Sequence, residues 1–270
     1  MSRYDAHTTL RFERPHPGVL EIVLDNPPVN TVGIEGHRHL TEVWLDVARD
    51  PEVRAVLLRA EGRAFSAGGD FDLLDHIRED HANAARVMRE AGELVRNIIE
   101  CPQPIVSAIN GVAVGAGLAA ALLADIPIAG RSARLLDGHV TIGVAAGDHA
   151  VVLWPLLIGM AKAKYHLLTN EPIDGTEAER LGLVAKVVDD EALRAEATEV
   201  AVRLAEGSQT AIEWTKRSLN HWLRAATPAF DASLALEFLG WLGPDAAEGI
   251  GAAREKRPPR FSQSTSRNPD

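Results

Sequence analysis

Two glycine-rich segments of this 270-residue sequence are suited to holding a carbonyl oxygen. Residues 64–70 read AFSAGGD, and Gly115-Ala116-Gly117 stands where a helix is expected to begin. Small residues let backbone N–H groups approach a ligand closely, and a helix N-terminus presents free N–H donors. One N–H from each segment could stabilise an oxygen that becomes negative during a reaction. We therefore predict an oxyanion hole; the structural alternatives are a tight turn in the first segment and close helix–strand packing in the second.

Residues 115–120 also fit the pattern G-x-G-x-x-A, which is typical of dinucleotide-binding turns. That fingerprint normally belongs to the first strand–helix turn of its domain, and an acidic residue ends the following strand. Here the following strand, at 126–130, runs into Arg131. The pattern therefore favours an oxyanion loop over a site for NAD.

Strands and helices alternate through the first half of the chain. Hydrophobic periodicity and turn residues predict strands at 19–25, 53–59, 105–109 and 126–129, and helices at 35–49, 83–100 and 117–124. A strand, a helix and a strand in succession indicate a parallel crossover. From Gly147 onward the pattern is mostly helical. These features predict an α/β fold with a helical C-terminal part.

Composition excludes several classes of protein. The formal net charge is −10 with the acidic residues scattered, so we expect no nucleic-acid partner. A single cysteine, Cys101, and no legible secretory signal suggest a cytoplasmic protein, and no metal ligand set is predicted. The uncharged stretch 101–124 contains Pro102, Pro104 and three glycines, which indicates buried strand, turn and helix rather than a membrane span.

Five motifs together resemble the enoyl-CoA hydratase/isomerase (crotonase) superfamily, and the likeness runs from about Leu20 to Phe261. The matching segments are LDNPPVN at 24–30, GRAFSAGGDFDLL at 62–74, CPQPIVSAINGVAVGAGLAAALLADIPIA at 101–129, NEPIDGTEAERLGLVAKVV at 170–188 and EGIGAAREKRPPRF at 248–261.

The resemblance implies a fold and an assembly. Residues 1–200 would form a spiral core of repeated ββα units with the acyl-CoA site, 201–261 a helical trimerisation region, and 262–270 a flexible tail. The family commonly forms a homotrimer or a dimer of trimers. The partner would be an acyl-CoA thioester, with coenzyme A arriving as part of the substrate and no permanently bound cofactor.

The resemblance also implies roles for individual residues. The backbone N–H groups of Gly69 and Ala116 would form the oxyanion hole. The residues that would line the path of coenzyme A are Ala64, Ala67, Asp70 and Phe71.

The departures from the family concern catalysis. The hydratases use two glutamates, which activate water and deliver a proton to the α-carbon, and these positions fall on Ala119 and His139 here. Asp148 follows His139 by nine residues, and a carboxylate bonded to one imidazole nitrogen raises the basicity of the other. We therefore predict His139 and Asp148 as catalytic residues in place of the glutamates, with helix capping as the alternative for Asp148. No second acid–base group is evident, and His149 is expected on the surface.

Two other functions remain open. The segment from Asp137 onward, DGHVTIGVAAGDHAVVLWPLL, also resembles the oxocamphor hydrolase branch, in which a similarly spaced histidine and aspartate support retro-Claisen cleavage of β-diketones. That branch has a further histidine where this chain has Ala116. The other possibility is an acyl-CoA binding protein that has lost its chemistry together with the carboxylate at position 119.

Overall fold

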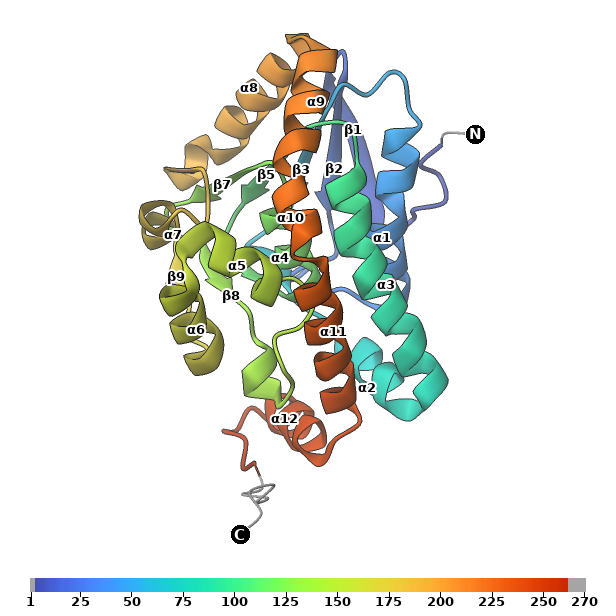
Figure 1. Cartoon of the computed structure of the whole chain (residues 1–270), viewed down its shortest axis with the longest axis vertical. Coiled ribbons are helices and arrows are strands. Elements are labelled where there is room, and N and C mark those ends of the chain that lie inside the picture. Colours follow the sequence, from blue (N-terminus) through green and yellow to red (C-terminus); the bar gives the residue numbers. More distant parts are fainter. Residues whose placement is uncertain (1–2, 262–270) are drawn as a thin grey trace.

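A computed structural model describes residues 3–261, and the predicted tail at 262–270 lies outside the described residues. Strands lie behind a layer of long helices, and the helices of the C-terminal region, coloured orange to red, run down the middle of the view (Figure 1). The described helices are α1 (Ile34–Ala48), α2 (Phe71–Glu79), α3 (His81–Glu100), α4 (Gly115–Leu122), α5 (Ala150–Ile158), α6 (Met160–Thr169), α7 (Gly175–Leu181), α8 (Leu193–Glu206), α9 (Gln209–Leu219), α10 (His221–Ala225), α11 (Thr227–Trp241) and α12 (Pro244–Glu255), with short 3-10 turns η1 (His139–Ile142) and η2 (Asp190–Ala192).

The larger sheet has six strands, in the order β1-β2-β3-β5-β7-β10. All neighbours pair in parallel except β1 and β2, which form an antiparallel edge. The central strands read as apolar runs because both of their faces are covered. The bounds are β1 (Leu10–His16), β2 (Val19–Leu24), β3 (Ala55–Ala60), β5 (Ile105–Ile109), β7 (Ile126–Gly130) and β10 (Lys186–Val188).

The smaller sheet has four strands, in the order β4-β6-β8-β9. Strands β4, β6 and β8 are parallel, and β9 closes the sheet in the antiparallel sense. From β3 to β8, consecutive strands alternate between the two sheets, so that β3 and β4, β5 and β6, and β7 and β8 form successive turns of a ββα spiral. The bounds are β4 (Ala64–Ala67), β6 (Val112–Val114), β8 (Arg134–Leu136) and β9 (Ile173–Asp174).

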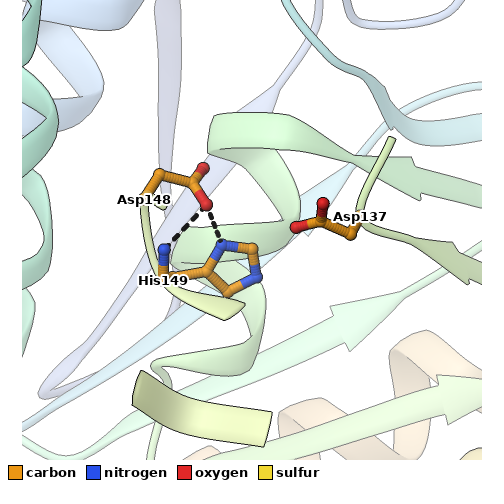
Figure 2. Close-up of side chains that lie close together, drawn as sticks. All are labelled: Asp137, Asp148 and His149. Carbon is orange, nitrogen blue, oxygen red and sulfur yellow. Dashed lines mark hydrogen bonds and ion pairs between the residues drawn. The ribbon is translucent and has the colours of Figure 1, made fainter. Parts of the chain in front are cut away.

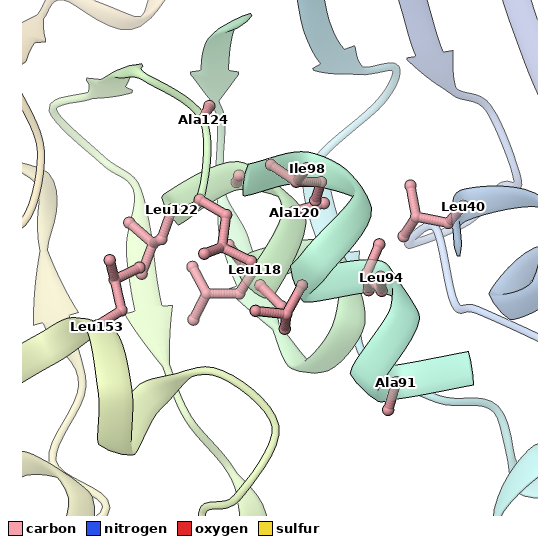
Figure 3. Close-up of a cluster of buried hydrophobic side chains, with 14 of the residues drawn as sticks. Leu40, Ala91, Leu94, Ile98, Leu118, Ala120, Leu122, Ala124 and Leu153 are labelled. Carbon is pink, nitrogen blue, oxygen red and sulfur yellow. The ribbon is translucent and has the colours of Figure 1, made fainter. Parts of the chain in front are cut away.

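The core consists of two hydrophobic layers. Leu94 and Ile98 of α3 pack against Leu118 of α4, and Leu153 of α5 lies beyond α4 (Figure 3). The opposite face of the larger sheet is covered by α8, whose apolar side chains include Ala197. The predicted division at residue 200 falls inside α8.

The sequence-based elements agree well with the structure. The crossover from β2 through α1 to β3 is parallel as predicted, and β5 matches its predicted bounds. The uncharged stretch 101–124 forms β5, β6 and α4. Across the described part of the chain, no helix is long and apolar enough to cross a membrane. The edge strand β1 was not predicted, because its partly exposed residues lack the apolar run of the central strands. Strand β10 and the four strands of the smaller sheet were not predicted either, because each is only two to four residues long.

The C-terminal helices pack closely on the segment that follows β8. A Cβ at Gly147 would lie 2.3 Å from the Ser233 carbonyl oxygen of α11, and a Cβ at Gly249 of α12 would lie 2.3 Å from the Ile142 carbonyl oxygen. Ser233 donates its hydroxyl to the Gly147 carbonyl at 2.8 Å. These contacts bring α11 and α12 against the predicted catalytic segment.

The glycine of the second loop, Gly117, packs against β4. A Cβ at Gly117 would lie 2.3 Å from the Ser66 Cβ atom. Ser66 is fully buried, and its hydroxyl accepts a hydrogen bond from the Gly68 N–H at 3.2 Å. Close packing of helix on strand therefore accounts for this glycine of the G-x-G-x-x-A pattern.

We expect Gly117→Ala to lower the free energy of unfolding by about 1–3 kcal/mol, because the added methyl group overpacks the contact with Ser66. The control is Gly251→Ala in α12, where a Cβ meets nothing within 4 Å. That change is expected to be neutral or to stabilise by up to about 1 kcal/mol. Urea unfolding measures both, and equal effects would contradict the packing role.

Candidate active site

Three parallel strands of the smaller sheet end together at one edge. Ala67 of β4, Val114 of β6 and Leu136 of β8 lie side by side in the register. The next residues along each strand are Gly68, Gly115 and Asp137. The carboxyl ends of parallel strands are the usual position of ligand sites in α/β folds. The two glycine-rich loops and the His139 segment are thereby brought to one place.

The two glycine-rich loops lie in direct contact. A Cβ at Gly115 would lie 3.1 Å from the Gly68 Cα atom, and both glycines have positive φ angles, of +59° and +84°. The absence of side chains at these two positions allows the backbones to approach. The N–H groups of the following residues, Gly69 and Ala116, are therefore brought near each other.

Both N–H groups are free of structural hydrogen bonds within residues 3–261. The Val32 N–H donates to the Gly68 carbonyl at 2.9 Å, and the Asp70 N–H donates to the Val32 carbonyl at 3.0 Å, so the Gly69 N–H is not used in this pairing. Ala116 is the second residue of α4, and N–H groups in the first turn have no partner within the helix. Both N–H groups are therefore available to a ligand.

A cavity of about 360 Å³ opens in front of these donors. Gly69, Ala116, Ala67 and Phe71 line it, together with His139 and Asp148. Two other predicted residues, Asp70 and Ala64, are not among the residues that line it. Asp70 caps α2 by accepting from the Leu73 N–H at 2.8 Å, and the Ala64 carbonyl accepts from the side-chain amide of Asn30 at 2.8 Å.

His139 lies at the start of η1, between two carboxylates. Its Nδ1 atom is 3.1 Å from Asp137 Oδ2, and its Nε2 atom is 3.5 Å from Glu237 Oε1. The side chains of all three residues are buried. The turn at Gly138, whose φ angle is +88°, folds the imidazole back toward Asp137. The sequence predicted Asp148 as the carboxylate partner of His139, whereas in the structure the hydrogen-bonded partner is Asp137.

Asp148 pairs with the neighbouring histidine instead. Its Oδ1 atom accepts from both the backbone N–H and the ring Nδ1 atom of His149, at 2.7 Å each, and Asp137 faces the ring from the other side (Figure 2). His149 is completely buried, so its predicted surface position is wrong. Asp148 nevertheless lies close to His139. One ring nitrogen of His139 and one carboxylate oxygen each of Asp148 and Glu237 lie within 4.8 Å of one another.

Burial and the neighbouring charges shift the pKa values of this cluster. Burial acts to lower the pKa of His139, but the charges of Asp137, Glu237 and Asp148 hold that pKa well above its usual value. Burial raises the pKa of Glu237 to about 7, against the charge of His139. Burial opposes ionisation of Asp148, yet His149 and His139 keep its pKa well below the ordinary range.

The cluster could in principle hold a cation or share protons. Two overlapping sets of three side chains have the required spacing, Asp137, Asp148 and His149 in one, and His139, Asp148 and Glu237 in the other. The neighbouring carboxylates raise the pKa values of both histidines, so each imidazole can hold a proton within this cluster. The cluster is therefore suited to sharing protons.

Sequence reasoning did not find Glu237. This residue lies on α11, about a hundred positions after His139, and accepts a hydrogen bond from the Trp241 indole N–H at 3.0 Å. Its Oε2 atom is buried without a hydrogen-bond partner in the described structure. The available signal was a single acid inside the apolar run LALEFLGWL.

The sequence profile described as enoyl-CoA hydratase/isomerase matches residues 14–264 of the chain. The chain belongs to the enoyl-CoA hydratase/isomerase family. The predicted family, the crotonase-like α/β fold and an enoyl-CoA hydratase-like enzyme are thereby confirmed. The position of the family's first glutamate, Ala119, is buried in α4 and does not lie on the cavity wall.

Relatives of the chain cover nearly its whole length. A protein of Mycobacterium bovis named as a probable enoyl-CoA hydratase is 33% identical over 265 residues, covering 94% of this chain and 92% of the relative. The 1,2-epoxyphenylacetyl-CoA isomerase of Escherichia coli is 33% identical, over 91% of this chain and 95% of that protein. The crystal structure of an enoyl-CoA hydratase/isomerase from Mycobacterium paratuberculosis superposes with a TM-score of 0.86 at 36% identity, covering 92% and 99% of the two chains.

We expect the free energy of unfolding of the Glu237→Gln variant to increase relative to that of the unsubstituted protein as the pH rises from 5 to 8. An unfolded glutamate titrates near about 4.3. Because the folded pKa is raised to about 7, the stability that protonated Glu237 contributes is complete at low pH and is lost as the pH rises through that value. Glutamine cannot ionise, so the variant does not lose this contribution to stability.

Urea unfolding at pH 5, 6, 7 and 8 measures the difference between the two proteins. Glu199→Gln, which removes an exposed acid from α8, controls for the loss of one charge. A stability difference that does not change with pH would show that Glu237 is ionised throughout.

Proposed function

We propose that the protein is a hydratase- or isomerase-type enzyme that moves a proton at the α-carbon of an acyl-CoA thioester through an enolate. The observation that carries this proposal is that two free N–H donors, Gly69 and Ala116, share one cavity with the buried acid–base group His139. The family profile and the names of the relatives support a thioester as substrate.

The thioester carbonyl would lie between the N–H groups of Gly69 and Ala116. Removing one donor from an oxyanion hole typically costs about 3–4 kcal/mol of transition-state stabilisation. Ala67 and Phe71 on the cavity wall would contact coenzyme A, and the Arg254 guanidinium lies 4.8 Å from the Phe71 ring centroid. Ala64 and Asp70 would support this path from behind. Coenzyme A would arrive and leave with the acyl group.

His139 and Glu237 would do the work of the two glutamates of the family. In hydration of a 2,3-enoyl thioester, the oxygen of water bonds to the β-carbon, one proton of the water passes to the acid–base pair, and a proton is delivered to the α-carbon. A glutamate with a pKa of about 7 next to a histidine can both accept and donate protons near neutral pH. Asp148 would hold negative charge beside His139 and stabilise its protonated form.

An assembly of three chains, or a dimer of two such trimers, is part of the proposal. Large apolar side chains are exposed along the C-terminal helices: Trp214, Leu219, Trp222, Leu236 and Leu239 are each at least 60% exposed. Contiguous exposed apolar patches mark protein–protein interfaces, and these side chains would form one between the subunits. Analytical ultracentrifugation distinguishes a trimer or hexamer from a monomer.

We expect the purified protein to hydrate crotonyl-CoA and His139→Ala to lower kcat about 10²- to 10⁴-fold, because general acid–base catalysis contributes that much. Loss of the enoyl-thioester absorbance measures the rate. The control is His166→Ala: His166 is buried too, but its Nδ1 atom bonds the Glu171 carbonyl and its side chain lies off the cavity wall.

Other outcomes would replace the proposal. Saturable binding of crotonyl-CoA and other enoyl thioesters without turnover would identify an acyl-CoA binding protein. Cleavage of cyclic β-diketones in the absence of coenzyme A would identify a retro-Claisen hydrolase. Binding of NAD that is abolished by Gly117→Val would identify a dinucleotide enzyme.

We expect Gly115→Ala to lower kcat by about 10²-fold or more, because the added Cβ separates the two loops and misplaces an oxyanion donor. The control is Gly159→Ala, which places alanine at a similar φ of +77° but in open space. Steady-state kinetics compares the two. Equal losses in both variants would assign the effect to backbone strain alone.

A further inference from the structure

The cavity has a second wall that is almost entirely apolar. It is built by α1, α2 and α3 and the strand segment before α1. Besides Phe71, its apolar members are Val32, Leu73, Leu74, Ile77, Val87 and Ala91. One polar side chain interrupts this wall: His37 of α1, which is only 5% exposed.

The ring of His37 is held on one side by a hydrogen bond to Glu90. Its Nδ1 atom lies 3.0 Å from Glu90 Oε2 on α3, and Arg86, one turn earlier on α3, lies 4.0 Å from the other Glu90 oxygen. A carboxylate only accepts hydrogen bonds, so Nδ1 carries the proton. In the neutral ring Nε2 is then an acceptor.

The acceptor atom of His37 is unused. Among residues 3–261, Nε2 makes no hydrogen bond, although the ring is more than nine-tenths buried. The acid–base cluster belongs to other elements, since it comes from η1, the segment before α5, and α11. No ion pair between described residues joins His37 to that cluster. The His37 side chain is therefore a polar group on an otherwise apolar cavity wall, separate from the acid–base cluster.

We infer that the acyl group of the substrate carries a hydroxyl away from the thioester, and that this hydroxyl donates a hydrogen bond to His37 Nε2. The inference rests on the proposed function, because it takes the cavity as the site of the acyl chain. An apolar pocket with one oriented polar group selects ligands that satisfy that group. A site built in this way rejects the analogue without the hydroxyl, since binding it leaves a buried acceptor unpaired.

Calorimetric binding of saturated thioesters tests this inference without turnover. The ligands are hexanoyl-CoA, its derivatives hydroxylated at carbon 4, 5 or 6, and the corresponding ketones at carbons 4 and 5. We expect one hydroxylated isomer to bind roughly 10- to 100-fold more tightly than hexanoyl-CoA. Its ketone, which cannot donate, is expected to bind no better than hexanoyl-CoA.

Variants of His37 link the preference to this residue. His37→Phe should abolish the preference and leave hexanoyl-CoA binding as tight or tighter, while His37→Gln, which keeps an acceptor, should restore part of it. His166→Phe, a buried histidine off the cavity wall, should leave the preference unchanged. Thermal unfolding verifies that each variant is folded.

The contrary results are distinct. A hydroxyl preference that survives in His37→Phe, or no preference in the unsubstituted protein, overturns the role of His37. A preference for the ketone overturns the hydroxyl assignment and points to a protonated ring. Failure of every thioester to bind the unsubstituted protein overturns the proposed function itself.

Discussion

The register of three short parallel strands is the constraint on which the site depends. Because Ala67, Val114 and Leu136 are paired side by side, the segments that follow β4, β6 and β8 leave the sheet at the same level. A slip of one residue would turn every side chain of a strand to the other face. The hydrogen-bond ladder of a four-stranded sheet thus sets the relative positions of two N–H donors and an imidazole that are far apart in sequence.

Close contacts at glycines bring the loops that follow these strands, and the helices around them, together at the site. Gly68 and Gly115 let two loops touch, and Gly117 lets α4 pack on Ser66, which in turn holds the Gly68 N–H. Gly147 and Gly249 let α11 and α12 pack on the backbone around η1. The cluster is complete only when α11 is in place, since Glu237 comes from that helix. The helical C-terminal region is therefore part of the candidate active site as well as a candidate assembly surface.

Burying three carboxylates and two imidazoles together is costly unless their charges compensate one another. Asp137 pairs with His139, Asp148 pairs with His149, and Glu237 is left with a pKa raised to about 7 by burial. As a result, the Glu237 carboxyl group on the cavity wall can gain or lose a proton near neutral pH. Groups with such pKa values are suited to acid–base chemistry near neutral pH. His37, by contrast, is hydrogen-bonded to Glu90 on the apolar wall of the cavity and lies outside this cluster.

The sequence by itself determined the alternation of strands and helices, the two glycine-rich loops, and the motifs that assign the family. These features are local: apolar periodicity, turn residues and short motifs state them without knowledge of the rest of the chain. Only the tertiary structure decided that His139 pairs with Asp137, that His149 is buried, and that Glu237 joins them. The reason is physical. The partners of a buried charge are set by how α11 and the loop before α5 pack on η1, and segments separated by about a hundred residues carry no local pattern that reports this packing.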